Sequence, residues 1–248
     1  MSWANYQDKV RRYFPFSNTE WKNFGVLVFV FALMWSFDRW GTTTFDAQEG
    51  IKNFLIAAVT IGIVVFVHHA AQRLLGIWYG YRIEHKIWWI GLIAGMLVTV
   101  LTFGDRSFFI FAASVMQAHF MPAHRLGTFR YGPSLRQIGS SAFVGPIAAV
   151  TVSFLLYLIA PSVFRDMLDF SLYFGLFNLL PIPPLDGFQV FVGTRAAMSG
   201  GFWYKFLISA GIGFFLVYFL TGLGLWWSLA LATIIGIGGW LALEAFDL

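Results

Sequence analysis

The residues best suited to chemistry in this chain lie in two apolar stretches that are far apart in the sequence. The first stretch carries adjacent histidines, His68 and His69, with Gln72 one helical turn later. The second ends at Asp186, inside the segment Asn178–Gly187 (NLLPIPPLDG). An ionisable side chain at membrane depth is costly and marks a functional site by default. Imidazole and carboxylate groups are also common zinc ligands and general acids or bases.

The composition predicts a membrane protein. Apolar residues make up 58% of the 248 residues and charged residues only 11%, against roughly 45–50% and about 25% in soluble domains. We therefore expect an integral, multi-pass protein whose partners are the lipid bilayer and other membrane proteins. The net charge of +4 is spread over short loops, which argues against nucleic-acid binding. The chain has no Cys, which excludes disulfides and thiolate metal sites.

The apolar segments predict an all-α transmembrane helical bundle with six or seven spans. Residues 1–21 are expected to be an amphipathic juxtamembrane segment, and residues 22–248 a single transmembrane domain. Ser17 and Glu20 have the spacing of a capping box, which predicts a helix start. The apolar piece 108–116 is too short to span and is expected to be re-entrant or interfacial. The expected spans are 24–37, 51–71 with an amphipathic extension to 79, 87–103, 138–160, 164–180 and two within 202–246, bent near 221–224.

The distribution of basic residues gives conflicting signals about orientation. Four Lys or Arg residues precede or begin the first span and two follow it, which favours a cytoplasmic amino terminus. Four more lie in the connection 104–136, which this order of spans places on the other side. The residues concerned are Lys9, Arg11, Arg12 and Lys22, then Arg39 and Lys52, then Arg106, Arg125, Arg130 and Arg136.

The segment Asn178–Gly187 resembles the Asn-x-x-Pro-x-x-Pro-Leu-Asp-Gly motif of site-2 proteases, the intramembrane zinc metalloproteases. The stretch Tyr79–Trp88 looks like the sequence that follows the His-Glu-x-x-His motif in archaeal and bacterial members. Gly145 and Pro146 match the start of the family's Gly-Pro-x-x-Asn motif. The resemblance covers about residues 55–195, and it implies a site-2 protease-like core in a prokaryotic cell membrane.

The chain departs from the family at the positions that carry chemistry. The resemblance implies that His68 is the first metal ligand and that Asp186 is the third. His69 occupies the position of the general-base Glu, Gln72 that of the second ligand His, and Ala149 that of the Asn. The expected pocket comprises Asn178, Pro181, Gly187, Gly145, Pro146 and Ala149.

These substitutions predict that the metal chemistry is lost. The neutral amide of Gln72 is a poor zinc ligand, and His69 is rotated by about 100° from His68 around the helix. Loss of the general base alone commonly costs about 10²–10⁴-fold in rate. We therefore expect no intact catalytic residue, a vestigial metal set of His68, Gln72 and Asp186, and no cofactor, with zinc bound only if the chain is active.

Other roles are predicted for the polar side chains that remain. His68 and Asp186 are expected to form an ion pair that replaces the metal, because an isolated buried carboxylate would otherwise become protonated. Gln72 is expected to hydrogen-bond to one of them, and His69 to be a structural hydrogen-bonding residue. His119 and His124 are expected to be solvated loop histidines.

Three functions follow from this reasoning. The first is a pseudoprotease that binds transmembrane segments as a scaffold or as a subunit of a membrane complex. The alternative is an active intramembrane zinc metalloprotease with an atypical metal site. A transporter is a third possibility, although no inverted repeat is visible in the sequence. Haem ligation by His68 or His69 would need a second histidine at matching depth on another span, and none is evident in the sequence.

Overall fold

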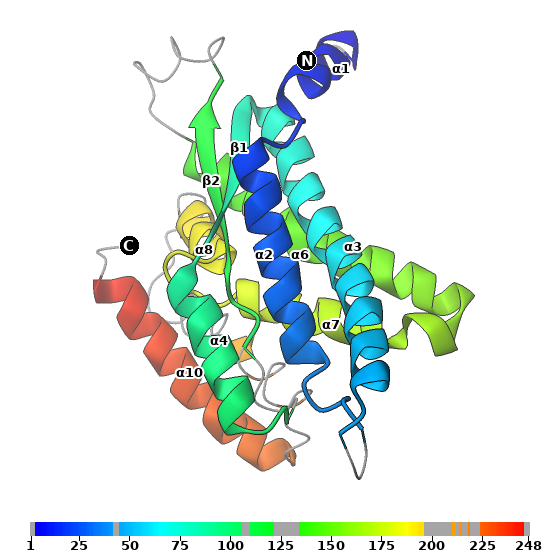
Figure 1. Ribbon diagram of the computed structural model, residues 1–248. Coiled ribbons are helices and arrows are strands. Elements are labelled where there is room, and N and C mark those ends of the chain that lie inside the picture. The colour runs from blue at the N-terminus through cyan, green and yellow to red at the C-terminus, as the bar shows by residue number, and fades with distance from the viewer. Residues whose placement is uncertain are drawn as a thin grey trace.

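The structure is a computed structural model that describes residues 3–41, 45–105, 110–121, 134–195, 210–211, 214, 218 and 224–245. Long helices dominate it, and a short two-stranded sheet lies beside them (Figure 1). The predicted bend near 221–224 and the first of the two carboxy-terminal spans fall largely outside the described residues. In chain order the elements are α1 (Trp3–Tyr13), α2 (Asn18–Trp35), α3 (Ala47–Tyr79), β1 (Tyr81–Ile87), α4 (Trp89–Leu101), β2 (Ser114–Phe120), α6 (Leu135–Ile159), α7 (Pro161–Asn178), α8 (Asp186–Arg195) and α10 (Leu225–Ala245).

Two of the predicted helices begin at side-chain caps. The capping box at the start of α2 is confirmed, because Ser17 Oγ accepts from the backbone N–H of Glu20 and the Glu20 carboxylate accepts from that of Ser17. Asp46 caps α3, because its carboxylate accepts from the backbone N–H groups of Gln48 and Glu49. Gly80 ends α3 at φ 92°, a left-handed conformation that glycine adopts without a steric cost.

The predicted six or seven spans are not confirmed in the part of the chain that the structure describes. There, α3 and α6 are long and apolar enough to cross a membrane. They match the predicted span 51–71, with its amphipathic extension to 79, and the predicted span 138–160. The predicted span 87–103 is wrong as drawn, because its first residue belongs to β1 and α4 has only 13 residues. A helix of that length covers about 20 Å, less than a bilayer core of about 30 Å.

The all-α prediction is corrected by β1 and β2, which form an antiparallel pair with Tyr81 opposite Phe120 and Ile87 opposite Ser114. The physical reason is visible in β1, where buried and more exposed residues alternate with the period of a strand. Tyr81, Ile83 and His85 point to the buried side. The piece 108–116, expected to be re-entrant or interfacial, supplies the first three residues of β2.

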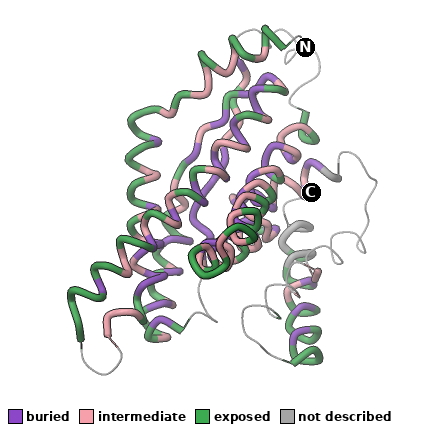
Figure 2. The backbone as a smooth tube through the Cα atoms, turned by 90° about the vertical axis from the view of Figure 1, so that its right-hand side faces the viewer, coloured by how far each residue is buried: buried purple, intermediate pink, exposed green. Residues whose placement is uncertain are grey.

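The buried face of α3 is apolar along its first half and polar at His68 and Gln72. The inner face buries apolar residues such as Ile61 and Val64, and continues into His68 and Gln72. The outer face carries large apolar side chains that are exposed, such as Leu55 and Val59. Figure 2 shows buried segments concentrated in the interior of the molecule and exposed segments on its outside. This is the pattern expected of a protein that faces lipid rather than water.

The apolar core lies next to the polar part of this α3 face. Phe111 packs edge-on against Phe31 of α2 and Phe170 of α7, with ring centroids 5.1 Å and 5.0 Å apart. Trp35 and Phe174 complete the cluster, and all five side chains are buried. Edge-to-face aromatic pairs each add about 0.5–1.5 kcal/mol beyond the area they bury. The cluster therefore fixes α7, and with it the turn that leads to Asp186.

Candidate functional site

The Asp186 turn is shaped by a close backbone approach. After α7 ends, residues 179–185 make a tight connection, and Asp186 is the first residue of α8. A Cβ atom on Gly187 would lie 2.1 Å from the carbonyl oxygen of Leu179 and 2.4 Å from that of Leu180. No real side chain tolerates such contacts, so this position requires glycine. The turn places the Asp186 carboxylate inside the protein, where the residue is 1% exposed.

His68, Gln72 and Asp186 meet as the sequence predicts. His68 Nε2 lies 2.9 Å from Asp186 Oδ2, and Gln72 Nε2 donates to the same oxygen at 2.8 Å. Gln72 Nε2 also donates to the carbonyl oxygen of Ala142 at 3.0 Å. His68 and Gln72 are fully buried. We call this set of three side chains the Asp186 brace, because it ties α3 to α8 and, through Ala142, to α6.

The orientation of the Gln72 amide is fixed at both of its ends. Its NH₂ group faces two acceptors, the Asp186 carboxylate and the Ala142 carbonyl. Its Oε1 accepts from His85 Nε2 at 2.9 Å. A flipped amide would point its oxygen at two other oxygens and leave the His85 donor without an acceptor. Gln72 therefore presents a hydrogen-bond donor, not a ligand atom, to the carboxylate.

This donor set does not fit a zinc site. Zinc needs about 2.0–2.2 Å to each nitrogen or oxygen ligand and at least three protein ligands. His68 Nε2 and Asp186 Oδ2 are already hydrogen-bonded to each other, and the third position offers an NH₂ group. Within the described ranges, no group of three or more His, Cys, Asp or Glu side chains could hold a metal ion. His68 Nδ1 and Asp186 Oδ1 are buried without a hydrogen-bond partner.

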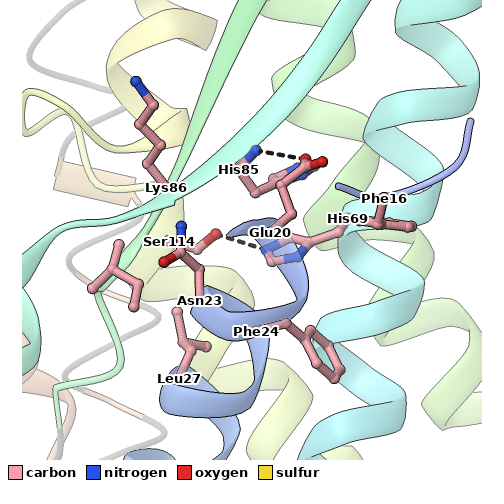
Figure 3. Close-up of a pocket in the computed structure, with 10 residues that line it drawn as sticks. Phe16, Glu20, Asn23, Phe24, Leu27, His69, His85, Lys86 and Ser114 are labelled. Carbon is pink, nitrogen blue, oxygen red and sulfur yellow. Dashed lines mark hydrogen bonds between the residues drawn. The ribbon is translucent and has the colours of Figure 1, made fainter. Parts of the chain in front are cut away.

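His69 points toward Ser114 at the start of β2 (Figure 3). Its Nε2 lies 2.7 Å from Ser114 Oγ at the start of β2, and its ring stacks on that of His85 with centroids 3.8 Å apart. The rings of His68 and His69 are inclined at 73°. Adjacent positions on α3 thus serve different neighbours, in accord with the predicted rotation of about 100°. His69 bonds as a structural residue would.

The buried histidine His85 was not assigned a role in the sequence analysis. It joins the two sets, because it stacks on His69 and donates to Gln72 of the brace. Burial, with His69 and Arg73 acting in the same direction, holds the pKa of His85 well below its ordinary value, so the ring is neutral at pH 7. The signal was present in the alternation of Tyr81, Ile83, His85 and Ile87, which a strand reading would have placed on one face.

A buried ion pair next to His85 connects α3 to the start of α2. Arg73 pairs with Glu20 and donates to the carbonyl oxygens of Phe14 and Pro15 at 2.9 Å and 3.0 Å. The Glu20 carboxylate also accepts from the backbone N–H of His85 at 3.3 Å. Next to it lies a cavity of about 220 Å³. Its lining comprises Ser17, Thr19, Glu20, Asn23, Glu84, His85, Lys86, Ile87 and Trp89.

The predicted pocket residues lie on α6, at the end of α7, in the turn and at the start of α8. Asn178 is buried and donates to the carbonyl oxygen of Phe174 at 2.7 Å, which ends α7. Gly145 lies against Gln72, since a Cβ there would meet the Gln72 side chain at 2.7 Å. Pro146 and Ala149 follow on the buried face of α6, and Pro181 is buried in the turn. Among the predicted pocket residues on α6, Gly145 therefore lies directly against the brace.

Of the two histidines predicted to lie in loops, the structure describes only His119. His119 lies on β2, not in a loop, and its side chain is 53% exposed, with Nε2 at 3.8 Å from a Glu84 carboxylate oxygen. The prediction of a solvated side chain is confirmed for His119, and the predicted loop setting is wrong. His124 lies outside the described residues.

Comparison with known proteins gives a distant relationship to metalloproteases. The chain is 24% identical over 187 residues to a candidate zinc metalloprotease of Methanocaldococcus jannaschii. The match covers 71% of this chain and 85% of that relative. No protein-family model and no solved structure matches the chain. The distant relationship supports the metalloprotease part of the resemblance.

Proposed function

We propose that this chain is a multi-pass membrane protein of the site-2 protease kind that has lost its metal chemistry and binds transmembrane segments. It acts as a scaffold or as a subunit of a larger membrane complex. The observation that carries the proposal is the Asp186 brace, in which hydrogen bonds take up the atoms that would hold zinc. Gln72 and His69 stand where a second ligand and a general base are required.

The fold is kept together without a metal because the brace connects the same elements. In a metal site, one ion would tie the helix that carries His68 to the turn that carries Asp186. Here the His68 contact and the Gln72 bond make that connection, and Ala142 extends it to α6. A buried carboxylate that accepts two hydrogen bonds is stabilised in the interior. The inherited shape therefore remains available for binding.

The binding surface of this proposal lies beside β1. The cavity of about 220 Å³ has polar walls from α2 and β1 and borders the exposed apolar residue Trp89. A cavity of mixed polarity at the edge of a sheet suits an unwound end of a transmembrane segment, which must satisfy its backbone groups inside a membrane. The exposed apolar faces of α3 and α6 suit packing against further transmembrane helices.

A native pull-down tests the scaffold role. The full chain, purified from its own membranes in a mild detergent, is expected to bring a membrane protein with it in fixed stoichiometry. A chain with Lys86→Ala and Asn23→Ala, both in the cavity wall, is expected to lose that partner while remaining folded. A chain that elutes alone from native membranes would overturn the proposal. Matched substitution of exposed Lys52 to Ala is the control.

The second candidate is an active metalloprotease with an atypical site. It is favoured by the relationship to a candidate zinc metalloprotease and by the unpartnered His68 Nδ1 and Asp186 Oδ1. Its test is cleavage of a single-span substrate by the purified chain, with and without a chelator. Chelator-sensitive cleavage that Asp186→Asn abolishes would establish this candidate and exclude the scaffold-only role.

A further inference from the structure

Basic residues gather at one end of the molecule, next to α1. Four hydrogen bonds define this end. Two of them tie the amino-terminal segment to the end of α3: Tyr6 Oη donates to Leu74 O at 3.1 Å, and Arg73 donates to Phe14 O at 2.9 Å. The other two tie the chain after β2 to the start of β1: Met121 N donates to Gly80 O at 3.2 Å, and Ser134 N donates to Tyr81 Oη at 3.0 Å. Figure 1 shows α1, the end of α3 and the start of β1 together at the top. The basic residues there are Lys9, Arg11, Arg12, Lys22, Arg82 and Arg136.

The return of β2 brings one of the four basic residues of the connection 104–136, Arg136, to the α1 end. The order of spans places the whole connection 104–136 at the end opposite the amino terminus. Because β2 runs back along β1, residue 121 reaches Gly80 and Ser134 reaches Tyr81. Arg136, in the first turn of α6, therefore lies at the α1 end. The other three basic residues of the connection are outside the described residues.

At the opposite end of the molecule, acidic residues outnumber basic residues in the part of the chain that the structure describes. This end is defined by the connection between α2 and α3, by the end of α4 and by the start of α7. Gly104 lies against Asp38, and Arg39 pairs with Asp166. Its described acidic residues are Asp38, Asp46, Glu49, Asp105 and Asp166, and its described basic residues are Arg39, Lys52 and Arg165.

Aromatic side chains mark the depth of α1. Tyr6 packs edge-on against Trp78 with ring centroids 5.2 Å apart, and lies tilted against Trp3 with centroids 5.7 Å apart. Trp3 is 66% exposed, and α1 buries none of its residues completely. Tyr and Trp concentrate at the level of the lipid headgroups. The apolar side of α1 thus lies against α3 while Arg11 and Arg12 remain exposed on its other side.

We infer that α1 is an interfacial helix whose basic face binds the headgroups of anionic lipids on the cytoplasmic side of the membrane. The inference rests on the membrane insertion contained in the proposed function. An anionic leaflet attracts Lys and Arg residues near its surface, and basic residues are enriched on the cytoplasmic side. The pair of Arg12 with Asp8 does not compete, because these side chains are 69% and 56% exposed and such pairs contribute little.

Lipid selectivity of the reconstituted full chain tests the contact. The association of spin-labelled phosphatidylglycerol is compared with that of spin-labelled phosphatidylcholine. Arg11→Gln/Arg12→Gln is expected to lower the preference for the anionic lipid by about tenfold. Lys52→Gln/Arg165→Gln removes the same charge at the opposite end and is expected to leave the preference unchanged. An equal fall in both variants, or no preference in the unaltered chain, would overturn the inference.

Orientation is tested in the same chain, which lacks cysteine. Gln7→Cys on α1 and Gln48→Cys near the start of α3 are both exposed positions. In intact cells a membrane-impermeant maleimide is expected to label only Gln48→Cys, and permeabilised cells should label at both. The reverse pattern would overturn the inference and leave the proposed function intact. Extraction of the chain by alkaline carbonate would instead remove the membrane insertion on which both proposals depend.

Discussion

Two faces of α3 differ in how their polar groups are used. On the face toward α6 and α8, His68 and Gln72 converge on Asp186 in a fully buried set. On the face toward the sheet, His69 bonds to Ser114 and stacks on His85, beside a cavity. The first face is closed by hydrogen bonds and holds the fold, whereas the second adjoins open space. Under the proposed function, the first face serves stability and the second serves binding.

The largest expected effect comes from Gly187→Ala, which attacks the turn on the Asp186 face. The added Cβ would collide with the backbone of Leu179 and Leu180, so the turn cannot keep its shape. We expect a loss of about 3 kcal/mol or more in the free energy of unfolding, measured by thermal unfolding in detergent. Gly25→Ala is the control, because nothing lies within 4 Å of its Cβ position. An equal melting temperature for the two variants would contradict the role of the turn.

Asp186→Ala should have the next largest effect. It leaves His68 Nε2 without its partner, and it takes the carboxylate acceptor from Gln72 Nε2. Removing one partner of a buried charged set costs about 3–5 kcal/mol. Chemical unfolding of the full chain measures this, with Asp8→Ala at an exposed site as the control. If Asp186→Ala is as stable as the unaltered chain, the carboxylate does not brace the fold.

His85→Phe tests the link between the two faces. Phenylalanine keeps a ring stacked on His69 and removes the donor to Gln72 Oε1. Leaving that amide oxygen unpaired is expected to cost about 1–3 kcal/mol. The loss should shrink when Gln72 is already replaced by Leu, which a double-mutant cycle measures. Strictly additive losses would show that the two faces are independent.

Ser114→Ala is expected to have the smallest effect. It removes one hydrogen bond to His69 on the sheet side, and the stacking on His85 remains. A net loss of about 1 kcal/mol is expected, again from unfolding in detergent. A loss comparable to that of Asp186→Ala would mean that the sheet face, and not the brace, dominates the stability of this region.

The sequence predicted the parts of the site that depend on helix periodicity and on motif letters. The spacing of His68, His69 and Gln72 indicated which side chains share a face, and the pairing of His68 with Asp186 is confirmed by geometry. The helices α3 and α6 lie where apolar length placed them. Their long apolar runs leave little competition from other structures. The roles assigned to these residues remain a proposal.

The sheet and its contribution to the site were not predicted. The residues of β1 lie between two apolar helices, and the sequence analysis assigned only Ile87 to a span and the rest of β1 to no element. His85 was therefore not placed beside His69, and Ser114 was not considered. Both contacts depend on the register of two strands that are separated by more than 25 residues in the chain, and periodicity within one segment does not contain that information.

Zinc content tests the central claim most directly. The unaltered chain and the variant His69→Glu/Gln72→His, which restores the His-Glu-x-x-His pattern, are purified identically and analysed for zinc per chain. The unaltered chain is expected to carry none, because Gln72 offers Asp186 a donor and not a ligand atom. The variant is expected to bind about one ion, since it regains three protein ligands. Stoichiometric zinc in the unaltered chain, lost in Asp186→Ala, would contradict the account.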